Sequence, residues 1–172
     1  GSVFATIMKG FGCRVIAYDP TPNPILSKNE IVVYVPLKEL YKKSDIISLH
    51  VPLFPETKHM INATALAQMK HDLILLNTGR GELIDSVALI EALKSGKLGG
   101  AGLDVYEEEE GIFFKDLSDQ IIKDDVLARL LTFPNVLMTS HQAFLTKEAL
   151  EKIAEITLQN IADFEGGRKL SN

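Results

Sequence analysis

Two residues that can act on an organic acid each follow an apolar stretch of this sequence. Arg80 stands between Gly79 and Gly81, directly after DLILLNT. Glycines let the backbone approach a ligand closely, and a guanidinium can bind a carboxylate through two parallel hydrogen bonds. His141 follows NVLMTS, and histidine is a natural proton donor near neutral pH. Each also has a structural explanation, because Arg80 could pair with a surface acid and His141 could simply end a strand.

A run of four glutamates, residues 107–110 in DVYEEEEG, could supply a partner for the histidine. Charge runs usually form solvated surfaces, but one carboxylate beside His141 would hold the imidazole in one tautomer. The spacing leaves open which of the four it is. Arg80, His141 and one glutamate together predict reduction of a 2-keto acid. The arginine would bind the carboxylate and the histidine would protonate the carbonyl oxygen, while a nicotinamide supplies hydride.

The opening residues have the spacing of part of a dinucleotide-binding βαβ unit. In such units the last glycine of G-x-G-x-x-G opens the first helix, and an acid about 20 residues later binds the adenosine ribose. Gly1 and Asp19 fit these two positions. A carboxylate here favours NAD over NADP, because it would repel a 2′-phosphate. The alternative, that Asp19 and Pro20 only end a strand with a turn, stays open on spacing alone.

Alternating apolar and amphipathic stretches must position these residues. Strands are expected over 14–19, 30–35, 45–51, 72–78, 99–106 and 135–140. Helices are expected within 1–12 and over 36–44, 62–70, 85–97, 124–131 and 146–167. Asn62 and Asp85 are the predicted N-caps of two of them. The proline-rich stretch 20–29 is expected to be turns, and the strands at 45–51 and 72–78 to be buried on both faces.

Strands that alternate with helices predict an α/β fold with a doubly wound, mostly parallel sheet. Ligands of such sheets bind beyond the carboxyl ends of the strands. Polar or ionisable residues gather at these ends: Asp19, residues 50–52, residues 77–81, Asp104 and His141. Asp104 is placed to meet the amide of a nicotinamide. The sequence therefore predicts a cofactor crevice along this edge.

Composition bounds the remaining possibilities. The chain has 172 residues, 46% hydrophobic and 24% charged, which suits one globular domain. Its net charge of −5 argues against nucleic acid as a partner, and no apolar run approaches the roughly 20 residues that span a bilayer. The single cysteine, Cys13, cannot form an internal disulfide and is expected to be a small buried residue. We therefore expect a cytoplasmic protein without a membrane segment or a metal site.

Seven blocks follow one another along the chain: KGFGCRVIAYDP, SDIISLHVPL, ETKHMIN, LLNTGRGELID, GLDVYEEEEGIFF, IIKDDVLARL and NVLMTSHQAFLTKEAL. Through them the sequence resembles the D-isomer-specific 2-hydroxyacid dehydrogenases over essentially its whole length. DVYEEEEGIFF and HQAFLT point to the fermentative D-lactate dehydrogenases within that family. The resemblance implies a Rossmann-type NAD-binding domain, NAD as cofactor, and a 2-keto or 2-hydroxy acid as substrate, with pyruvate and D-lactate as the expected pair.

The resemblance also assigns roles by position. The family's catalytic arginine falls on Arg80, its proton-donating histidine on His141, and its glutamate, the last acid of D-V-Y-E-x-E, on Glu109. The cofactor contacts that it implies are Gly1, Asp19, Val51, Pro52, Thr57, Thr78, Gly79, Arg80 and Asp104. The family usually has serine at the position of Gly79, so we expect a looser loop here. Its long helix near the C-terminus contributes to dimerisation, which implies a homodimer.

Only the cofactor domain of the family has a counterpart in these residues. The resemblance begins at the final glycine of the phosphate-binding loop. We therefore expect residues 1–172 to form a partial NAD-binding domain that lacks the first strand, most of the glycine-rich loop and the substrate domain. Two inner strands would then lack a partner on one side, and the chain alone is expected to be inactive. Two other interpretations stay open: an NAD(H)-sensing module like the family's corepressors, and an inactive fragment.

Overall fold

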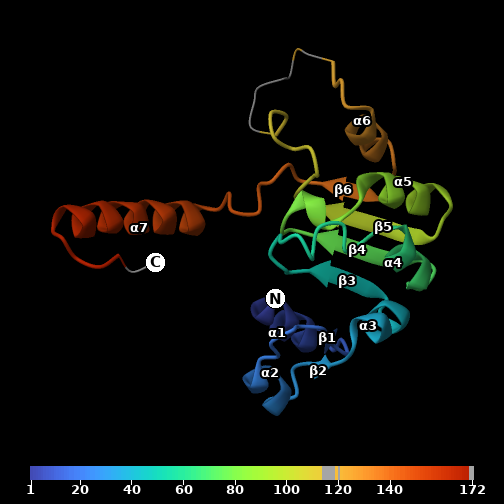
Figure 1. Ribbon diagram of the computed structural model, residues 1–172, viewed down its shortest axis with the longest axis horizontal. Helices are drawn as coiled ribbons and strands as arrows, with labels where there is room; N and C mark the ends of the chain where they lie inside the picture. The colour runs from blue at the N-terminus through green and yellow to red at the C-terminus, as the bar shows by residue number, and fades with distance from the viewer. Residues whose placement is uncertain (114–118, 120, 171–172) are drawn as a thin grey trace. The chain divides into compact units, whose positions relative to one another are not determined.

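The computed structural model describes residues 1–113, 119 and 121–170. It consists of two units, Gly1–Ser140 and His141–Asn172. The first unit contains the strands and the shorter helices, and the second contains one long helix (Figure 1). Part of the stretch 107–134, for which the sequence predicts one helix in an otherwise irregular segment, lies outside the described residues.

Parallel strands form two sheets in the first unit. The larger sheet has the order β3 (Ile46–Leu49), β4 (Leu73–Asn77), β5 (Leu98–Leu103) and β6 (Val136–Met138) (Figure 1). The smaller sheet pairs β1 (Ile16–Ala17) with β2 (Val33–Tyr34). Within the described residues β1 pairs only with β2, and β3 only with β4. The parallel α/β architecture is therefore confirmed, and β1, β2, β3 and β6 are the strands that pair on one side only among the described residues.

Five helices of the first unit lie in stretches predicted to be helical: α1 (Ser2–Gly10), α3 (Leu37–Lys43), α4 (Ala63–Gln68), α5 (Ser86–Lys94) and α6 (Asp125–Leu131). Two of them begin at the predicted N-caps. Asn62 accepts a hydrogen bond from the N–H of Ala65 at 3.1 Å, and Asp85 accepts one from Ala88 at 3.0 Å. Both predicted N-caps are confirmed. Each such bond satisfies a backbone donor that the first helical turn leaves without a partner.

Two short elements are absent from the sequence expectations. The proline-rich stretch contains α2 (Pro24–Lys28), and the 3-10 helix η1 (Gly81–Leu83) follows Arg80. α2 forms because the side chain of Asn23 accepts from the N–H of Ile25 at 3.0 Å while Pro24 occupies the first turn. Proline is tolerated there since its missing N–H would have no partner within the helix. The prediction of turns alone over 20–29 is therefore wrong.

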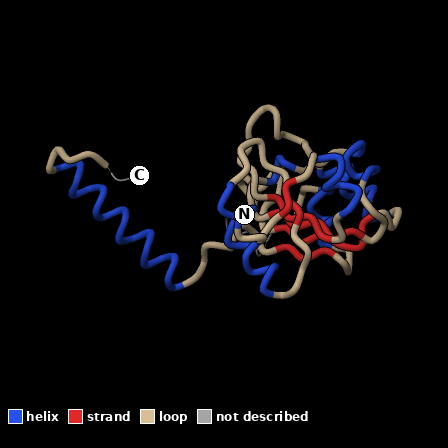
Figure 2. The backbone as a smooth tube through the Cα atoms, turned by 90° about the horizontal axis from the view of Figure 1, so that it is seen from below, coloured by secondary structure: helices blue, strands red, loops and turns tan. Residues whose placement is uncertain are grey.

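The core of the first unit lies on one face of the large sheet. Figure 2 shows blue helices beside the red strands, and Leu66 of α4 and Leu89 of α5 belong to the buried cluster. Leu73 and Leu75 of β4 are completely buried there with Leu89 of α5. On the opposite face Ile46 is 52% exposed and Ile74 is 40% exposed. The prediction that these two strands are buried on both faces is wrong within the first unit, because the described helices of that unit cover only one face of the sheet.

The glycines of β5 allow neighbouring chains to approach closely. A Cβ on Gly100 would lie 2.8 Å from the carbonyl oxygen of Asn135, and one on Gly102 would lie 2.8 Å from a methyl of Leu76. Neighbouring segments of the chain therefore pack closely along this strand. Cys13 is exposed, so its predicted burial is wrong.

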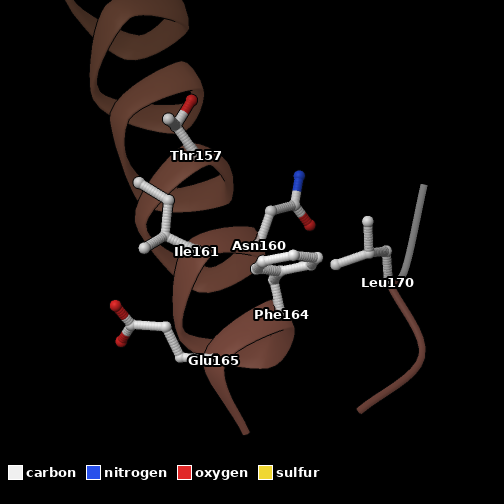
Figure 3. Close-up of a pocket in the computed structure, with 6 residues that line it drawn as sticks. All are labelled: Thr157, Asn160, Ile161, Phe164, Glu165 and Leu170. Carbon is white, nitrogen blue, oxygen red and sulfur yellow. The ribbon is translucent and has the colours of Figure 1, made fainter. Parts of the chain in front are cut away.

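The second unit is dominated by α7 (Lys147–Glu165), whose N-cap Thr146 accepts from the N–H of Ala149 at 3.2 Å. Several of its apolar side chains are exposed, including Ile153 and Phe164. Figure 3 shows Phe164 beside Leu170, where the chain turns back along the helix. No helix in the described part of the chain is long and apolar enough to cross a bilayer.

Candidate active site at the carboxyl ends of the strands

The loops that follow β3 and β4 adjoin at the carboxyl edge of the sheet. A Cβ placed on Gly79 would lie 3.6 Å from the carbonyl oxygen of Val51 and 3.5 Å from a methyl of Leu83. Both are ordinary van der Waals distances, so a small side chain fits at Gly79. The serine usual in the related sequences could therefore be accommodated. Two segments predicted to contact the cofactor, 51–52 and 78–80, lie side by side.

Asn77 holds the turn that presents Arg80. Its side chain is completely buried (0% exposed), with Nδ2 donating to the carbonyl of Arg80 at 2.9 Å. Its Oδ1 accepts from the N–H of Gly79 at 3.1 Å. The residue Arg80 is exposed, and one guanidinium N–H donates to the carbonyl of Gly79 at 2.9 Å. A guanidinium has five donors, so this bond is compatible with carboxylate binding at its other edge.

Gly81 brings the arginine turn into direct contact with the start of the glutamate run. A Cβ on Gly81 would lie 2.1 Å from the carbonyl carbon and oxygen of Tyr106, and 2.4 Å from the backbone nitrogen of Glu107. No side chain fits at such distances unless the backbone moves, so this position requires glycine. The turn after β4 and the segment after β5 therefore form one packed layer.

Asp104 lies buried at the end of β5, between its two neighbouring strands. The residue is 4% exposed. Its N–H donates to the carbonyl of Asn77 at 2.9 Å, and the hydroxyl of Thr139 donates to its Oδ1. A buried carboxylate is stable only when hydrogen-bonded, and Thr139 supplies such a bond. These contacts fix Asp104 at the edge where the sequence predicts a nicotinamide contact.

Glu109 bonds to its own segment, which Tyr106 anchors in the core. Oε2 of Glu109 accepts from the N–H of Tyr106 at 2.9 Å. The ring of Tyr106 is buried, and its hydroxyl donates to Asp124, the N-cap of α6, at 2.9 Å. Burial, and then the bond to Asp124, raise the pKa of Tyr106 well above its usual value. Tyr106 is therefore a neutral donor that ties the glutamate run to α6.

His141 is the first residue of the second unit and has an unusual backbone conformation. Ser140 and His141 have φ values of 52° and 55°. Non-glycine residues in this left-handed region cost about 1–3 kcal/mol each and concentrate at functional sites. The strain favours a functional interpretation of His141. Its pairing with Glu109 stays a prediction, because the two residues belong to different units.

Asp19 and Thr57 each make local hydrogen bonds. Asp19 accepts a hydrogen bond from the N–H of Thr21 at 2.8 Å. Such a turn is what we expect if Asp19 and Pro20 only end the strand. The hydroxyl of Thr57 donates to the carbonyl of Pro52 at 2.8 Å and accepts from the N–H of Phe54 at 2.8 Å. Thr57 thus shapes the loop after β3 from within. Cofactor contacts at these positions, and at Thr78, stay predictions.

The start of α1 lies beside the end of β3. A Cβ on Gly1 would lie 3.3 Å from the Cβ of His50, and the rings of Phe4 and His50 are 5.2 Å apart. Burial lowers the pKa of His50. Gly1 is therefore placed next to the loop that carries Val51 and Pro52.

The sequence assigned no individual role to Asn77 or His59, and it placed Glu107 only within the glutamate run. An asparagine that ends an apolar strand was an available signal, because a buried amide needs partners for both of its polar atoms. His59 and Glu107 are 48 residues apart in the sequence, yet Nε2 of His59 lies 2.5 Å from Oε1 of Glu107. Only the tertiary structure reveals that contact.

The groups at this edge suit a dinucleotide cofactor. The space at Gly79 lets a ligand approach the backbone, and carboxylates such as Asp19 and Asp104 are natural acceptors for ribose hydroxyls and an amide. In the described residues no group of three histidine, cysteine or acidic side chains could hold a metal ion.

Comparisons with known proteins agree with this geometry. The family model for the D-isomer specific 2-hydroxyacid dehydrogenase, NAD binding domain, matches residues 1–143. A 2-hydroxyacid dehydrogenase homolog from Zymomonas mobilis is 54% identical over 171 residues, which are 99% of this chain and 52% of that protein.

Two solved structures have the same fold. A D-lactate dehydrogenase from Treponema pallidum has a TM-score of 0.93 at 39% identity, covering 99% of this chain and 51% of that one. A D-lactate dehydrogenase from Lactobacillus jensenii, solved with NAD⁺, has a TM-score of 0.91 at 38% identity, with 99% and 51% covered. The chain thus spans about half the length of the curated relatives it matches. The expected fold class and the expected cofactor, NAD, are confirmed.

Proposed function

The chain belongs to the D-isomer specific 2-hydroxyacid dehydrogenases, and from this premise we propose that it is the NAD-binding part of a D-lactate dehydrogenase. The whole enzyme would interconvert pyruvate and D-lactate. NAD, when bound, supplies the hydride in one direction and accepts it in the other. The protein's own residues bind the acid, orient it and move the proton.

The placement of Arg80 carries the proposal. Asn77 fixes the turn through two hydrogen bonds, and Gly81 lets it pack directly on the backbone of Tyr106. The guanidinium is thereby presented at the edge where Asp104 also lies. A planar fork at this position can hold the carboxylate of a 2-keto acid through two bonds and can polarise the neighbouring carbonyl.

His141 and Glu109 complete the proposed catalytic set. During reduction the carbonyl oxygen becomes a hydroxyl, so one proton must reach it, and His141 would donate that proton. In the reverse direction His141 would accept it. Glu109 would hold the imidazole in the productive tautomer. The left-handed backbone at Ser140 and His141 supports a functional role for the histidine.

The predicted cofactor contacts belong to the same proposal. Asp19 would bind the adenosine ribose, and Asp104 the nicotinamide amide. The remaining contacts would come from Gly1, Val51, Pro52, Thr57, Thr78 and Gly79. A homodimer and a cytoplasmic location are further parts of it. Analytical ultracentrifugation of the full-length protein tests the dimer, and a single monomeric species would remove it.

The decisive experiment is turnover by the full-length protein, followed by NADH absorbance. We expect oxidation of NADH with pyruvate, D-lactate as the product, and much slower reaction with NADPH. Phenylpyruvate serves as a bulkier 2-keto acid that tests substrate choice. If no 2-keto acid supports NADH oxidation, the chain is not part of a working dehydrogenase.

A binding measurement on the 172 residues alone separates the cofactor site from catalysis. Titration with NADH, followed by its fluorescence, should saturate, and NADPH should not reproduce the effect because Asp19 repels the 2′-phosphate. Saturable binding would mean that this part of the crevice functions by itself. Failure to bind would mean that residues of the longer relatives are indispensable to it.

A further inference from the structure

A contact between His59 and Glu107 joins the loop after β3 to the glutamate run. Nε2 of His59 lies 2.5 Å from Oε1 of Glu107. The other oxygen of Glu107 accepts from the N–H of Ser86, the first residue of α5, at 3.3 Å. The Glu107 side chain is only 19% exposed, so solvent screens this contact less than a surface ion pair. Glu107 therefore bridges two elements that are distant in sequence.

The backbone of His59 is held in a strained conformation by two hydrogen bonds. Its φ is 50°, in the left-handed region. Its N–H donates to the carbonyl of Glu82 at 2.8 Å, and its carbonyl accepts from Nδ2 of Asn62 at 3.1 Å. A parallel bridge between Ile61 and Ile84 continues the pairing. Residues 59–61 are thus bonded to residues 82–84, which directly follow the arginine turn.

The backbone of Glu107 also packs directly against Gly81 in the candidate site. The backbone of Tyr106 and Glu107 covers Gly81, the glycine after Arg80. On the inner side of this segment, the hydroxyl of Tyr106 is bonded to Asp124. On the other side, the carboxylate of Glu107 is bonded to His59 and Ser86. The segment 106–109 is therefore fixed from two sides.

We propose that His59 and Glu107 are positioning residues, which hold the segment 106–109 against the arginine turn and so set the place of Glu109 relative to Arg80. This inference rests on the proposed function. Without His59, the carboxylate of Glu107 keeps, among the hydrogen bonds of the described residues, only the one from Ser86, and the segment can move over Gly81. A displacement of 1 Å in an active site can lower the rate about 100-fold. A segment 106–109 that is only partly loosened should therefore lower kcat roughly 10-fold.

The test uses the full-length protein with His59→Ala, Glu107→Ala and the double variant. Each single change should lower kcat roughly 10-fold, with NADH affinity changed by less than about twofold. Because both residues act through one contact, the double variant should be no slower than the slower single variant. Glu107→Gln keeps one oxygen that can accept from the N–H of Ser86, and its amide N–H can donate to Nε2 of a neutral His59, so this variant should recover most of the activity.

Lys58→Ala is the matched control. It removes the neighbouring exposed ion pair between Lys58 and Glu82, whose atoms are 2.6 Å apart, and should leave kcat unchanged. Rates are compared well below the unfolding temperature of every variant, checked by circular dichroism, so that lost stability cannot imitate lost positioning. A folded His59→Ala protein with kcat within about twofold of the wild type, or additive losses in the double variant, would overturn the inference.

Hydrogen exchange separates this inference from the proposed function. The N–H groups of Tyr106 and Ser86 donate to Glu109 and Glu107, so both should exchange faster in His59→Ala and at the wild-type rate in Lys58→Ala. If the wild-type protein reduces no 2-keto acid, the proposed function fails, and the exchange rates still decide the role of the pair. Unchanged exchange at both amides would refute it.

Discussion

Replacement of Gly81 by alanine tests the packed layer beneath the candidate site. The added Cβ would lie 2.1 Å from the carbonyl carbon and oxygen of Tyr106. These are backbone atoms, so no side-chain rotation can relieve the overlap. To reach even a tight contact of 3.0 Å, the segment at 106–107 must retreat by roughly 1 Å, in an interior packed as densely as an organic crystal.

The cost can be placed on a scale. Overpacking of a well-packed interior costs about 1–3 kcal/mol, and the upper end applies here because the obstructing atoms are backbone. A loss of about 3 kcal/mol is a large part of the 5–15 kcal/mol that stabilises a typical domain. The same retreat would shift Glu109 and Glu107, so the reduction of pyruvate should fall with stability.

The assay is urea denaturation of the full-length protein, with Gly79→Ala as the matched control two positions away. At Gly79 the nearest atom to the new Cβ lies at 3.5 Å. That variant should therefore change the free energy of unfolding by less than about 1 kcal/mol. Equal stability of Gly81→Ala and the wild type would refute the argument. So would a loss in Gly79→Ala as large as the loss in Gly81→Ala.

Three further predictions concern the site and its surroundings. Arg80→Lys should chiefly raise the KM for pyruvate, because an ammonium cannot reproduce the two parallel bonds of the guanidinium; an unchanged KM in steady-state kinetics would remove Arg80 from carboxylate binding. His141→Ala should lower kcat by roughly 100-fold or more, and near-normal turnover would exclude the histidine as the proton donor. His50 has a pKa lowered mainly by burial, so the unfolded state takes up its proton first as the pH falls. Its stabilising contribution is complete above the ordinary histidine pKa of about 6.5 and is lost as the pH falls through the lower native value. His50→Gln should therefore flatten the fall in unfolding temperature on acidification, and an unchanged pH profile would contradict this.

Local sequence signals were sufficient for most of the elements. The side chains of Asn62 and Asp85 cap α4 and α5 as predicted, because a cap depends only on residues within one turn. The apolar stretch at 72–78 contains β4 (Leu73–Asn77), and the stretch at 99–106 overlaps β5 (Leu98–Leu103). Since parallel strands bring their carboxyl ends to one edge, the sequence also indicated where ligands bind. The α2 helix was missed, although Asn23 and Pro24 form a recognisable start.

Burial was harder to predict than secondary structure. Ile46 and Ile74 have the apolar character of core residues, yet both are exposed on the uncovered face of the sheet. A run of apolar residues in a strand indicates which side chains could be buried. The arrangement of the helices decides which face of the sheet is covered. Cys13 is also exposed. Its burial likewise depends on which other segments of the chain pack against it, and the local sequence does not determine this.

By itself the sequence determined the α/β class, because this depends on local periodicity. Its resemblance to a known family, carried by motifs in order along the chain, also determined the family and the cofactor and predicted the edge that would carry the site. Tertiary structure alone decided that Asn77 holds the turn of Arg80, that Gly81 packs on Tyr106, and that His59 meets Glu107. These contacts join residues that folding brings together from separate loops. The energies of these contacts depend on distances of a few ångströms between atoms. Such distances cannot be read from residue types and their spacing in the sequence.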